Sequence, residues 1–384
     1  MRLSNPGTDK VVIDGKELQK LLDVLLRRGY TTIGPTLRDH AIVLDEIRST
    51  SQLPAGWIEE QGAGTYRLKK SNSNAWFGYV LTPTSWKPYL HSPSVKFWSA
   101  KRNGKGFDVE ETQTDPAKFA FIGVRACELN AITIQDNVFY GQDFQDQAYV
   151  QKRERAFIVA VNCSAAGRNC FCTSMDSGPK ALKNFDIALT EIIDGSNHYF
   201  VAETGTDLGT EILREVSITP AQEEQIRQAE QVITQTASGI SKMLDRTNIK
   251  DLLNRNLENR IWDTIAKRCL SCANCTMVCP TCFCTNVEDV TDLSGDHAER
   301  WRKWDSCFTV RFSYIHGGSI RPSIKSRYRQ WIMHKLSYWF DQFGSLGCTG
   351  CGRCITWCPV GIDLTEEVSA IRQSEKHVES KEDT

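Results

Sequence analysis

The sequence predicts an α/β domain followed by a helical connector and a cysteine-rich domain with a long insert. Two continuous apolar runs in the first half are typical of parallel strands buried on both faces. One-sided apolar spacing in the middle of the chain indicates helices, and a four-cysteine motif occurs twice with identical spacing near the end. The predicted bounds, in chain order, are 1–215 for the α/β domain, 216–268 for the connector, 269–368 for the cysteine-rich domain with its insert at 281–347, and 369–384 for a flexible tail.

The first elements follow from local patterns. Residues 12–14 lead into leucines spaced on one side of a helix at 18–26, which Gly29 ends because glycine adopts a left-handed cap without strain. Apolar runs at 41–44 and 76–81, bounded by Pro- and Ser-rich turns, predict strands.

The two longer apolar runs are 119–124 and 156–161. The intervening chain has room for one crossover helix near 129–138, so the runs are predicted to be neighbours in a right-handed βαβ unit. In the connector, Thr219 is the predicted N-cap of a helix, with Pro220 at its first position. A second predicted helix, marked by apolar residues from Leu253 to Ile265, runs into the first cysteine motif.

Composition excludes several classes of protein. The chain has 384 residues, 40% of them hydrophobic, and a formal net charge of -1, which gives no general reason to expect nucleic acid or an anionic membrane as partner. An apolar signal core and a stretch of about 20 apolar residues are both missing, so we expect a cytoplasmic protein without a membrane partner. Fifteen cysteines in a reducing compartment indicate metal binding rather than disulfides.

The repeated motif is C-x2-C-x2-C-x3-C-P, the run that bacterial ferredoxins use to bind two 4Fe-4S clusters. In that architecture the fourth cysteine of each run reaches the other cluster. The predicted ligands of cluster one are therefore Cys269, Cys272, Cys275 and Cys358, and those of cluster two are Cys348, Cys351, Cys354 and Cys279. Zinc is the weaker alternative, because zinc sites use paired C-x2-C hooks and do not need four-cysteine runs that end in proline.

Four further cysteines follow the two buried runs. Cys127 and Cys163 lie just past the carboxyl ends of these runs, where open α/β sheets place their ligands, and Cys170 and Cys172 share the next loop. The four either hold a third 4Fe-4S cluster or are buried structural thiols.

The insert holds Cys282, Cys284 and Cys307, one thiolate short of a standard set, although Asp305 or a borrowed cysteine could complete it. We expect these three to support cluster two. The insert also mixes cations with aromatics, which is compatible with nucleic-acid binding, with subunit docking or with a helix whose aromatics face inward. These residues are Arg300, Trp301, Arg302, Lys303, Trp304, Arg321, Lys325, Arg327, Tyr328, Arg329, Trp331, Lys335 and Trp339.

Neither a dinucleotide-binding G-x-G-x-x-G after a strand nor a P-loop occurs, so we expect no flavin or nucleotide on this chain. The seven histidines form no readable constellation with a nucleophile and a carboxylate, and we expect no catalytic residue.

Five segments together resemble the β, iron–sulfur subunit of cytosolic sulfhydrogenase-type nickel–iron hydrogenases, and the related A subunit of anaerobic sulfite reductase. They are Gly123–Glu128, Asn169–Cys172, Cys279–Cys284, Trp304–Cys307 and Gly350–Cys354. Ala126 stands where that family more often has proline.

The resemblance implies a non-catalytic electron-transfer subunit of a soluble oxidoreductase complex. In such complexes a flavin subunit exchanges hydride with NAD(P)H, an iron–sulfur subunit relays electrons, and the small and large subunits of a nickel–iron hydrogenase convert hydrogen. Two alternatives stay open: a relay subunit of a dissimilatory anaerobic sulfite reductase, and a nucleic-acid-binding protein with structural iron–sulfur clusters.

Overall fold

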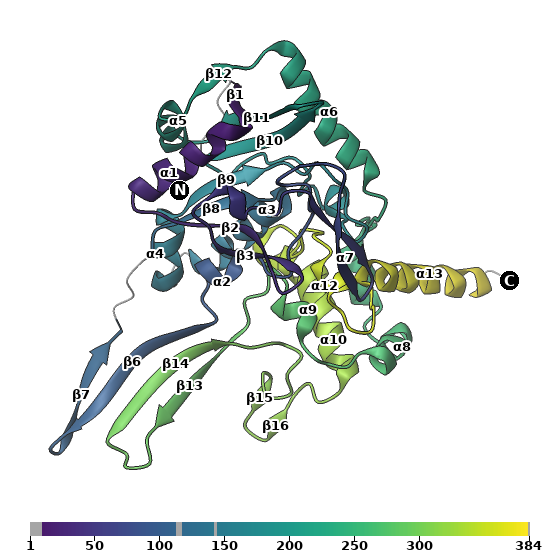
Figure 1. Ribbon diagram of the computed structural model, residues 1–384. Helices are drawn as coiled ribbons and strands as arrows, with labels where there is room; N and C mark the ends of the chain where they lie inside the picture. Colours follow the sequence, from purple (N-terminus) through teal and green to yellow (C-terminus); the bar gives the residue numbers. More distant parts are fainter. Residues whose placement is uncertain (1–9, 113–116, 142–143, 383–384) are drawn as a thin grey trace.

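The computed structural model describes residues 10–112, 117–141 and 144–382. Its centre is an eight-stranded mixed sheet with the strand order β12-β1-β11-β10-β9-β8-β2-β3 (Figure 1). The strands are β1 (Val11–Asp14), β2 (Thr31–Arg38), β3 (Ala41–Glu46), β8 (Phe119–Val124), β9 (Phe157–Val161), β10 (Ile187–Asp194), β11 (Asn197–Thr204) and β12 (Ile218–Pro220). A separate hairpin, β4 (Trp57–Gly62) and β5 (Thr65–Lys70), packs beside it.

The two apolar runs form adjacent parallel strands, as predicted, with Phe121 opposite Ile158. Their connection contains two helices rather than one, α3 (Ala126–Phe139) and α4 (Gln147–Arg155). Side chains of both strands are buried on both faces. The helices α1 (Leu18–Arg27) and α5 (Asp207–Arg214) pack on one face, and α2 (Lys87–Leu90), α3 and α4 pack on the other.

The strand predicted at 76–81 is wrong. The segment is an irregular loop, because two carboxylates accept from its backbone N–H groups in place of a neighbouring strand. Trp76 and Phe77 donate to Glu191, and Val80 and Leu81 donate to Glu59. The run is apolar, and side chains elsewhere in the protein satisfy its backbone N–H groups. In the sequence alone it therefore resembles a buried strand.

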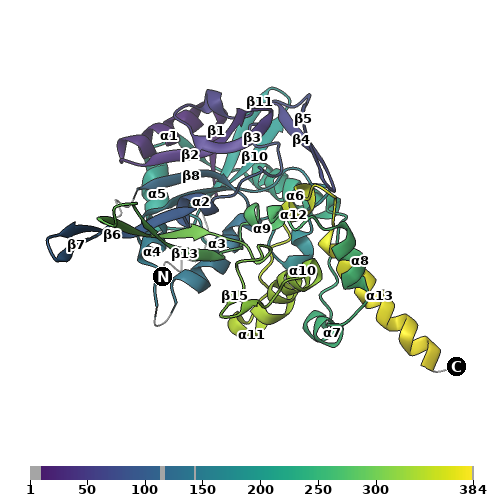
Figure 2. The ribbon, with the colours of Figure 1, turned by 90° about the horizontal axis from the view of Figure 1, so that it is seen from below.

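The connector also differs from the prediction. Pro220 ends the edge strand β12, which pairs with β1, so α6 (Glu223–Gly239) begins only after Gln222. The predicted second helix is two helices, α7 (Ile249–Arg255) and α8 (Ile261–Arg268). Trp262 donates from its indole to the Asn256 carbonyl in the break between them. Residues 369–382 of the predicted flexible tail belong to the helix α13 (Leu364–Glu382), which extends away from the body (Figure 2).

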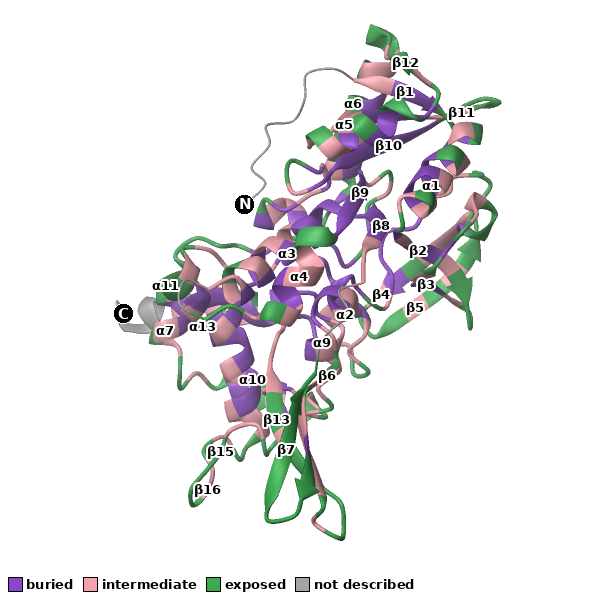
Figure 3. Ribbon diagram, turned by 90° about the vertical axis from the view of Figure 1, so that its left-hand side faces the viewer, coloured by how far each residue is buried: buried purple, intermediate pink, exposed green. Residues whose placement is uncertain are grey.

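A second sheet joins the insert to the first half of the chain. Its order is β13-β14-β6-β7, with β13 (Thr285–Thr291) and β14 (His297–Trp304) from the insert and β6 (Ser94–Asn103) and β7 (Gly106–Glu111) from the first half. It projects from the body and is largely exposed toward its tip (Figure 3). The helix considered for the basic, aromatic stretch is therefore wrong for residues 300–304, which form part of β14.

The rest of the cysteine-rich region surrounds a second apolar core. This core contains Leu253, Trp262, Phe308, Trp331 and Ile355. The remaining elements are α9 (Asn274–Met277), the hairpin β15 (Tyr314–Ile315) and β16 (Gly318–Ser319), α10 (Ile324–Met333), the π-helical turn η4 (His334–Tyr338), α11 (Trp339–Phe343) and α12 (Arg353–Thr356). Over the residues that the structure describes, no helix is both long and apolar enough to cross a bilayer.

Candidate metal centres

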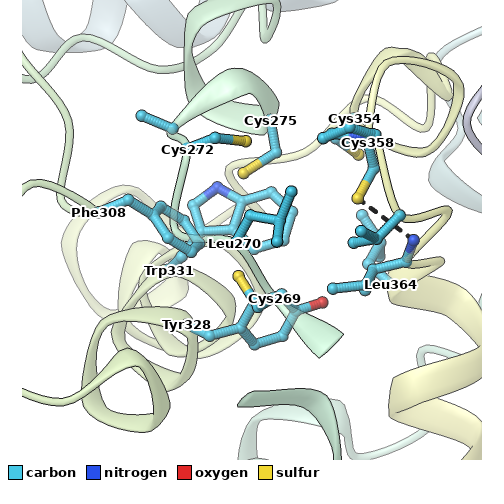
Figure 4. A pocket seen from close by; sticks show the side chains of 14 residues that line it. Cys269, Leu270, Cys272, Cys275, Phe308, Tyr328, Trp331, Cys354, Cys358 and Leu364 are labelled. Carbon is cyan, nitrogen blue, oxygen red and sulfur yellow. Dashed lines mark hydrogen bonds between the residues drawn. The ribbon is translucent and has the colours of Figure 1, made fainter. Parts of the chain in front are cut away.

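The four thiols predicted for cluster one surround a single cavity (Figure 4). Cys269 caps α8, Cys272 and Cys275 lie on the following loop and α9, and Cys358 comes from the second cysteine run. In the described parts of the chain, no three His, Cys, Asp or Glu side chains converge as ligands of one metal ion. The four thiols line the wall of the cavity.

Two orphaned donors test whether this cavity fits a cluster. The Tyr328 hydroxyl and the Trp331 indole N–H line it, are buried, and have no hydrogen-bond partner among the described residues. In Figure 4 the Trp331 nitrogen faces Cys272 and Cys275. A buried donor left without an acceptor costs about 1–3 kcal/mol, and sulfur atoms in the cavity would remove that cost. The residues present fit an iron–sulfur cluster.

The four thiols predicted for cluster two also lie together. Burial raises the pKa of Cys348 to about 11, and Cys279 and Cys351 act on it in the same direction. Burial raises the pKa of Cys354, and Cys348, Cys351 and Cys279 raise it further, as does Cys275 of the first group. Cys354 also lines the first cavity, so the two groups adjoin at this residue.

A buried lysine, Lys335, faces the second group from the π-helical turn η4. Its ammonium donates to the Cys279 thiol at 3.2 Å, to the Thr281 hydroxyl at 2.7 Å and to the Gly347 carbonyl at 3.1 Å. Only 5% of Lys335 is exposed, and it forms no ion pair with a carboxylate within the described residues. A buried cation needs a counter-charge, which thiolates and an anionic cluster would supply. The second group therefore fits a cluster as well.

The four upstream cysteines converge, and they do so against the second group. Burial raises the pKa of each of these thiols, that of Cys172 to about 12. Neighbouring cysteines of the same group raise the pKa of Cys127, Cys170 and Cys172 further. Cys351 of the second group raises the pKa of the same three thiols. The Cys170 thiol also donates to the Cys351 carbonyl at 3.8 Å. These four residues are Cys127, Cys163, Cys170 and Cys172.

Two glycines allow this approach. Gly350 and Gly352 have positive φ values, and a Cβ on either would lie within 2.6 Å of a backbone carbonyl oxygen in the 169–171 loop. Phe171 also donates its N–H to the Gly350 carbonyl at 2.8 Å. The loop with Cys170 and Cys172 is thus pressed onto the second cysteine run.

Replacing Gly352 by Ala is expected to destabilise the chain by about 2–5 kcal/mol, the sum of left-handed backbone strain and overpacking. The Cβ would meet the Asn169 carbonyl oxygen at 2.4 Å, and backbone cannot move aside cheaply. Gly344→Ala is the matched control, because Gly344 has a similar φ but open space around it. Thermal unfolding under anaerobic conditions measures both; equal losses would contradict the close-approach argument.

A buried ion pair beside these thiols joins the first half of the chain to the cysteine-rich domain. Arg353, on α12, reaches Glu128, on α3, with 2.5 Å between Nη2 and Oε1. Glu128 also accepts from the Trp86 indole and the Arg125 backbone N–H. The Arg125 guanidinium donates to four backbone carbonyls, among them Phe77 and Tyr79, so it holds the loop beside Cys163.

Cys282 lies beside Cys279 of the second group, and Cys284 and Cys307 lie next to each other nearby. Their role in supporting the second cluster stays a prediction. A hydrogen bond from Cys282 and the Lys335 ammonium hold the pKa of Cys279 below its usual value despite burial. A hydrogen bond from Cys307 lowers the pKa of Cys284 to about 7.

Sequence reasoning missed the polar residues around the thiols. It placed Lys335 in a basic, aromatic stretch with three open interpretations, gave no role to Arg353 or Glu128, and offered no signal for Tyr328 and Trp331 as donors. The one sign in the sequence that Lys335 is buried was its place among apolar residues of a helical pattern, next to Leu336.

Two comparisons with known proteins match this chain. A family model described as a 4Fe-4S dicluster domain matches residues 268–362. The chain is 31% identical to the sulfhydrogenase 2 subunit beta of Pyrococcus furiosus over 314 residues, which are 80% of this chain and 90% of the relative. No solved structure is significantly similar. The two cysteine runs lie in the matched dicluster domain, and the similarity to the relative extends over most of both chains. The chain therefore belongs to the family of sulfhydrogenase β subunits.

Proposed function

We propose that this chain is the iron–sulfur relay subunit of a multi-subunit oxidoreductase. It moves single electrons between a flavin subunit that exchanges hydride with NAD(P)H and a nickel–iron hydrogenase module. The similar protein from Pyrococcus furiosus is named as a sulfhydrogenase subunit, which supports a hydrogenase assembly.

The observation that carries the proposal is a continuous line of three thiol groups. Cys354 borders the first group, and Cys351 borders the upstream group. A 4Fe-4S cluster, when bound, takes up and releases one electron. The proposed holders, each set given with its cluster, are Cys269, Cys272, Cys275 and Cys358 for the first, Cys348, Cys351, Cys354 and Cys279 for the second, and Cys127, Cys163, Cys170 and Cys172 for a third.

The first group supplies the contact with a partner subunit. Among the fifteen cysteines, all of which the structure describes, only Cys272 is exposed. Leu270 and Val360, which line the same cavity, are exposed as well. A redox partner that covers this apolar edge comes close to the cluster without an intervening layer of protein.

Replacing Cys170 and Cys172 by Ser tests the third site. We expect the variant, prepared anaerobically, to hold about four fewer irons per chain than the parent, because one cubane carries four irons. Iron and acid-labile sulfide are measured together. Retention of all the iron would remove the upstream thiols from the line and leave only the ferredoxin-type pair.

The relay itself is tested by redox titration and by copurification from the native host. We expect reversible reduction by dithionite and a nickel-containing partner. A sirohaem-containing partner would indicate a sulfite reductase instead. Tight polynucleotide binding that falls steeply with salt, in a protein whose clusters cannot be cycled, would contradict electron transfer.

A further inference from the structure

Two buried donors on the helix α10 line the cavity of the first group of thiols. Tyr328 and Trp331 are three positions apart, so the helix places both side chains on one face. That face borders the cavity that Cys269, Cys272 and Cys275 also line (Figure 4). Tyr328 is 2% exposed and Trp331 is 4% exposed, and neither donor has a hydrogen-bond partner among the described residues. Both donors are therefore free for an occupant of the cavity.

The packing of three aromatic rings holds these donors in place. Phe308 lies edge-on to both, with its ring centre 6.0 Å from that of Tyr328 and 5.9 Å from that of Trp331. The Tyr328 and Trp331 ring centres are 5.5 Å apart. The Phe308 carbonyl accepts from the Arg327 guanidinium at 3.0 Å and from the Ser271 hydroxyl at 3.1 Å, which anchors the third ring. Because close-packed rings turn only if a void opens, the protein fixes the direction of both donors in advance.

One carboxylate lies near the Tyr328 hydroxyl, but it is bound elsewhere. Burial raises the pKa of Tyr328, and Glu367 and three thiols that line the cavity raise it further. Glu367 forms an ion pair with Arg268 and accepts no hydrogen bond from Tyr328. The hydroxyl thus has the thiols of the first group beside it and no unpaired carboxylate within the described residues.

We propose that Tyr328 and Trp331 donate hydrogen bonds to sulfur atoms of the first cluster and thereby raise its reduction potential. The inference rests on the proposed function, because it requires a cluster held by the first group. An electron delivered by a partner subunit adds one negative charge to the cluster, and a donor aimed at sulfur binds that more negative state more strongly. Since Cys272 of this group is exposed, the pair adjusts the cluster at the proposed partner contact from its buried side.

The test replaces Tyr328 by Phe, which removes one oxygen atom and keeps the ring. In the full chain, prepared anaerobically, a redox titration followed by electron paramagnetic resonance measures the potentials. We expect reduction of the first cluster to become about tenfold less favourable, which lowers its potential by about 59 mV. Trp331→Phe is expected to lower the same potential, and the double variant is expected to lower it further. Iron and acid-labile sulfide per chain are expected to equal those of the parent, because every thiol remains.

Two further variants control this experiment. Tyr149→Phe also removes a buried hydroxyl, one that donates to Asp136 in the core beside the main sheet, and is expected to leave both ferredoxin-type potentials unchanged. Lys335→Met acts at the second group and is expected to shift the other ferredoxin-type signal. The two sets of variants therefore assign each signal to its group of thiols.

Unchanged potentials in Tyr328→Phe and Trp331→Phe would overturn the inference, as would equal shifts of both ferredoxin-type signals or an equal shift in Tyr149→Phe. Loss of iron in Tyr328→Phe would show that the hydroxyl serves cluster assembly, which also contradicts a role confined to the potential. If Trp331→Phe does not fold, Tyr328→Phe decides alone. A parent protein without reducible clusters would overturn the proposed function as well, whereas reversible clusters with unmoved potentials would overturn only the role of these two donors.

Discussion

Replacing Glu128 by Gln is expected to destabilise the protein by about 3–5 kcal/mol, the cost of leaving one partner of a buried ion pair without its counter-charge. The Arg353 guanidinium would keep its bonds to the Thr82 and Thr84 carbonyls but lose its only carboxylate in the described residues. The Gln amide oxygen still accepts from the Trp86 indole, so the loss reports the charge together with the hydrogen bond to Arg353. The denaturant midpoint of the anaerobic protein measures the effect.

Two variants control this experiment. Glu224→Gln removes a carboxylate from an exposed pair with Arg227 and is expected to change stability little. The double variant Glu128→Leu with Arg353→Met removes both charges and is expected to be more stable than either single variant, because no unpaired charge remains. A double variant that is as unstable as the sum of the singles would show that the pair does not act as a pair.

Replacing Lys335 by Met is expected to lower the reduction potential of the second cluster on the order of 100 mV. A unit charge about 5 Å from a cluster contributes roughly 3 kcal/mol at an effective dielectric constant of about 20. For one electron, a tenfold change in the equilibrium constant corresponds to about 59 mV. The lost ammonium had favoured the reduced, more negative cluster. Redox titration followed by electron paramagnetic resonance measures the shift.

The comparison variant is Lys250→Met, which removes a partly exposed lysine that pairs with Asp341 on the surface. It is expected to leave all potentials within a few tens of millivolts, because water and salt screen an exposed charge. Equal shifts in the two variants would mean that Lys335 acts through the general field of the protein and not through its contact with Cys279.

The sequence was sufficient where the information is local. Ligand spacing within a C-x2-C-x2-C-x3-C run needs no knowledge of the rest of the chain, and the crossing of Cys279 and Cys358 between groups follows from the architecture of ferredoxins. The parallel strands around Cys127 and Cys163 were equally readable, since continuous apolar runs are buried on both faces. Sheet topology then explained why these two thiols meet.

The sequence was insufficient where partners are distant along the chain. Trp76–Leu81 looked like a strand because nothing local shows that Glu191 would take its N–H groups. Nothing local shows that Lys335 is buried, since burial of a lysine depends on which thiols the fold places beside it. Pairing of β14 with β6 joins segments about 200 residues apart, and no periodicity encodes such a partner.

The β6–β14 pairing also bears on the order in which the protein is made. Contacts between segments so far apart in sequence form late, because the long loop must close before they are gained. A ribosome synthesises β6 long before β14, so one edge of β6 stays unpaired until β14 has been made. Each predicted ferredoxin-type cluster takes a cysteine from both runs, so its ligand set is complete only after the second run has been synthesised. An excised 268–362 fragment would lack β6, the strand that pairs with β14 of its insert.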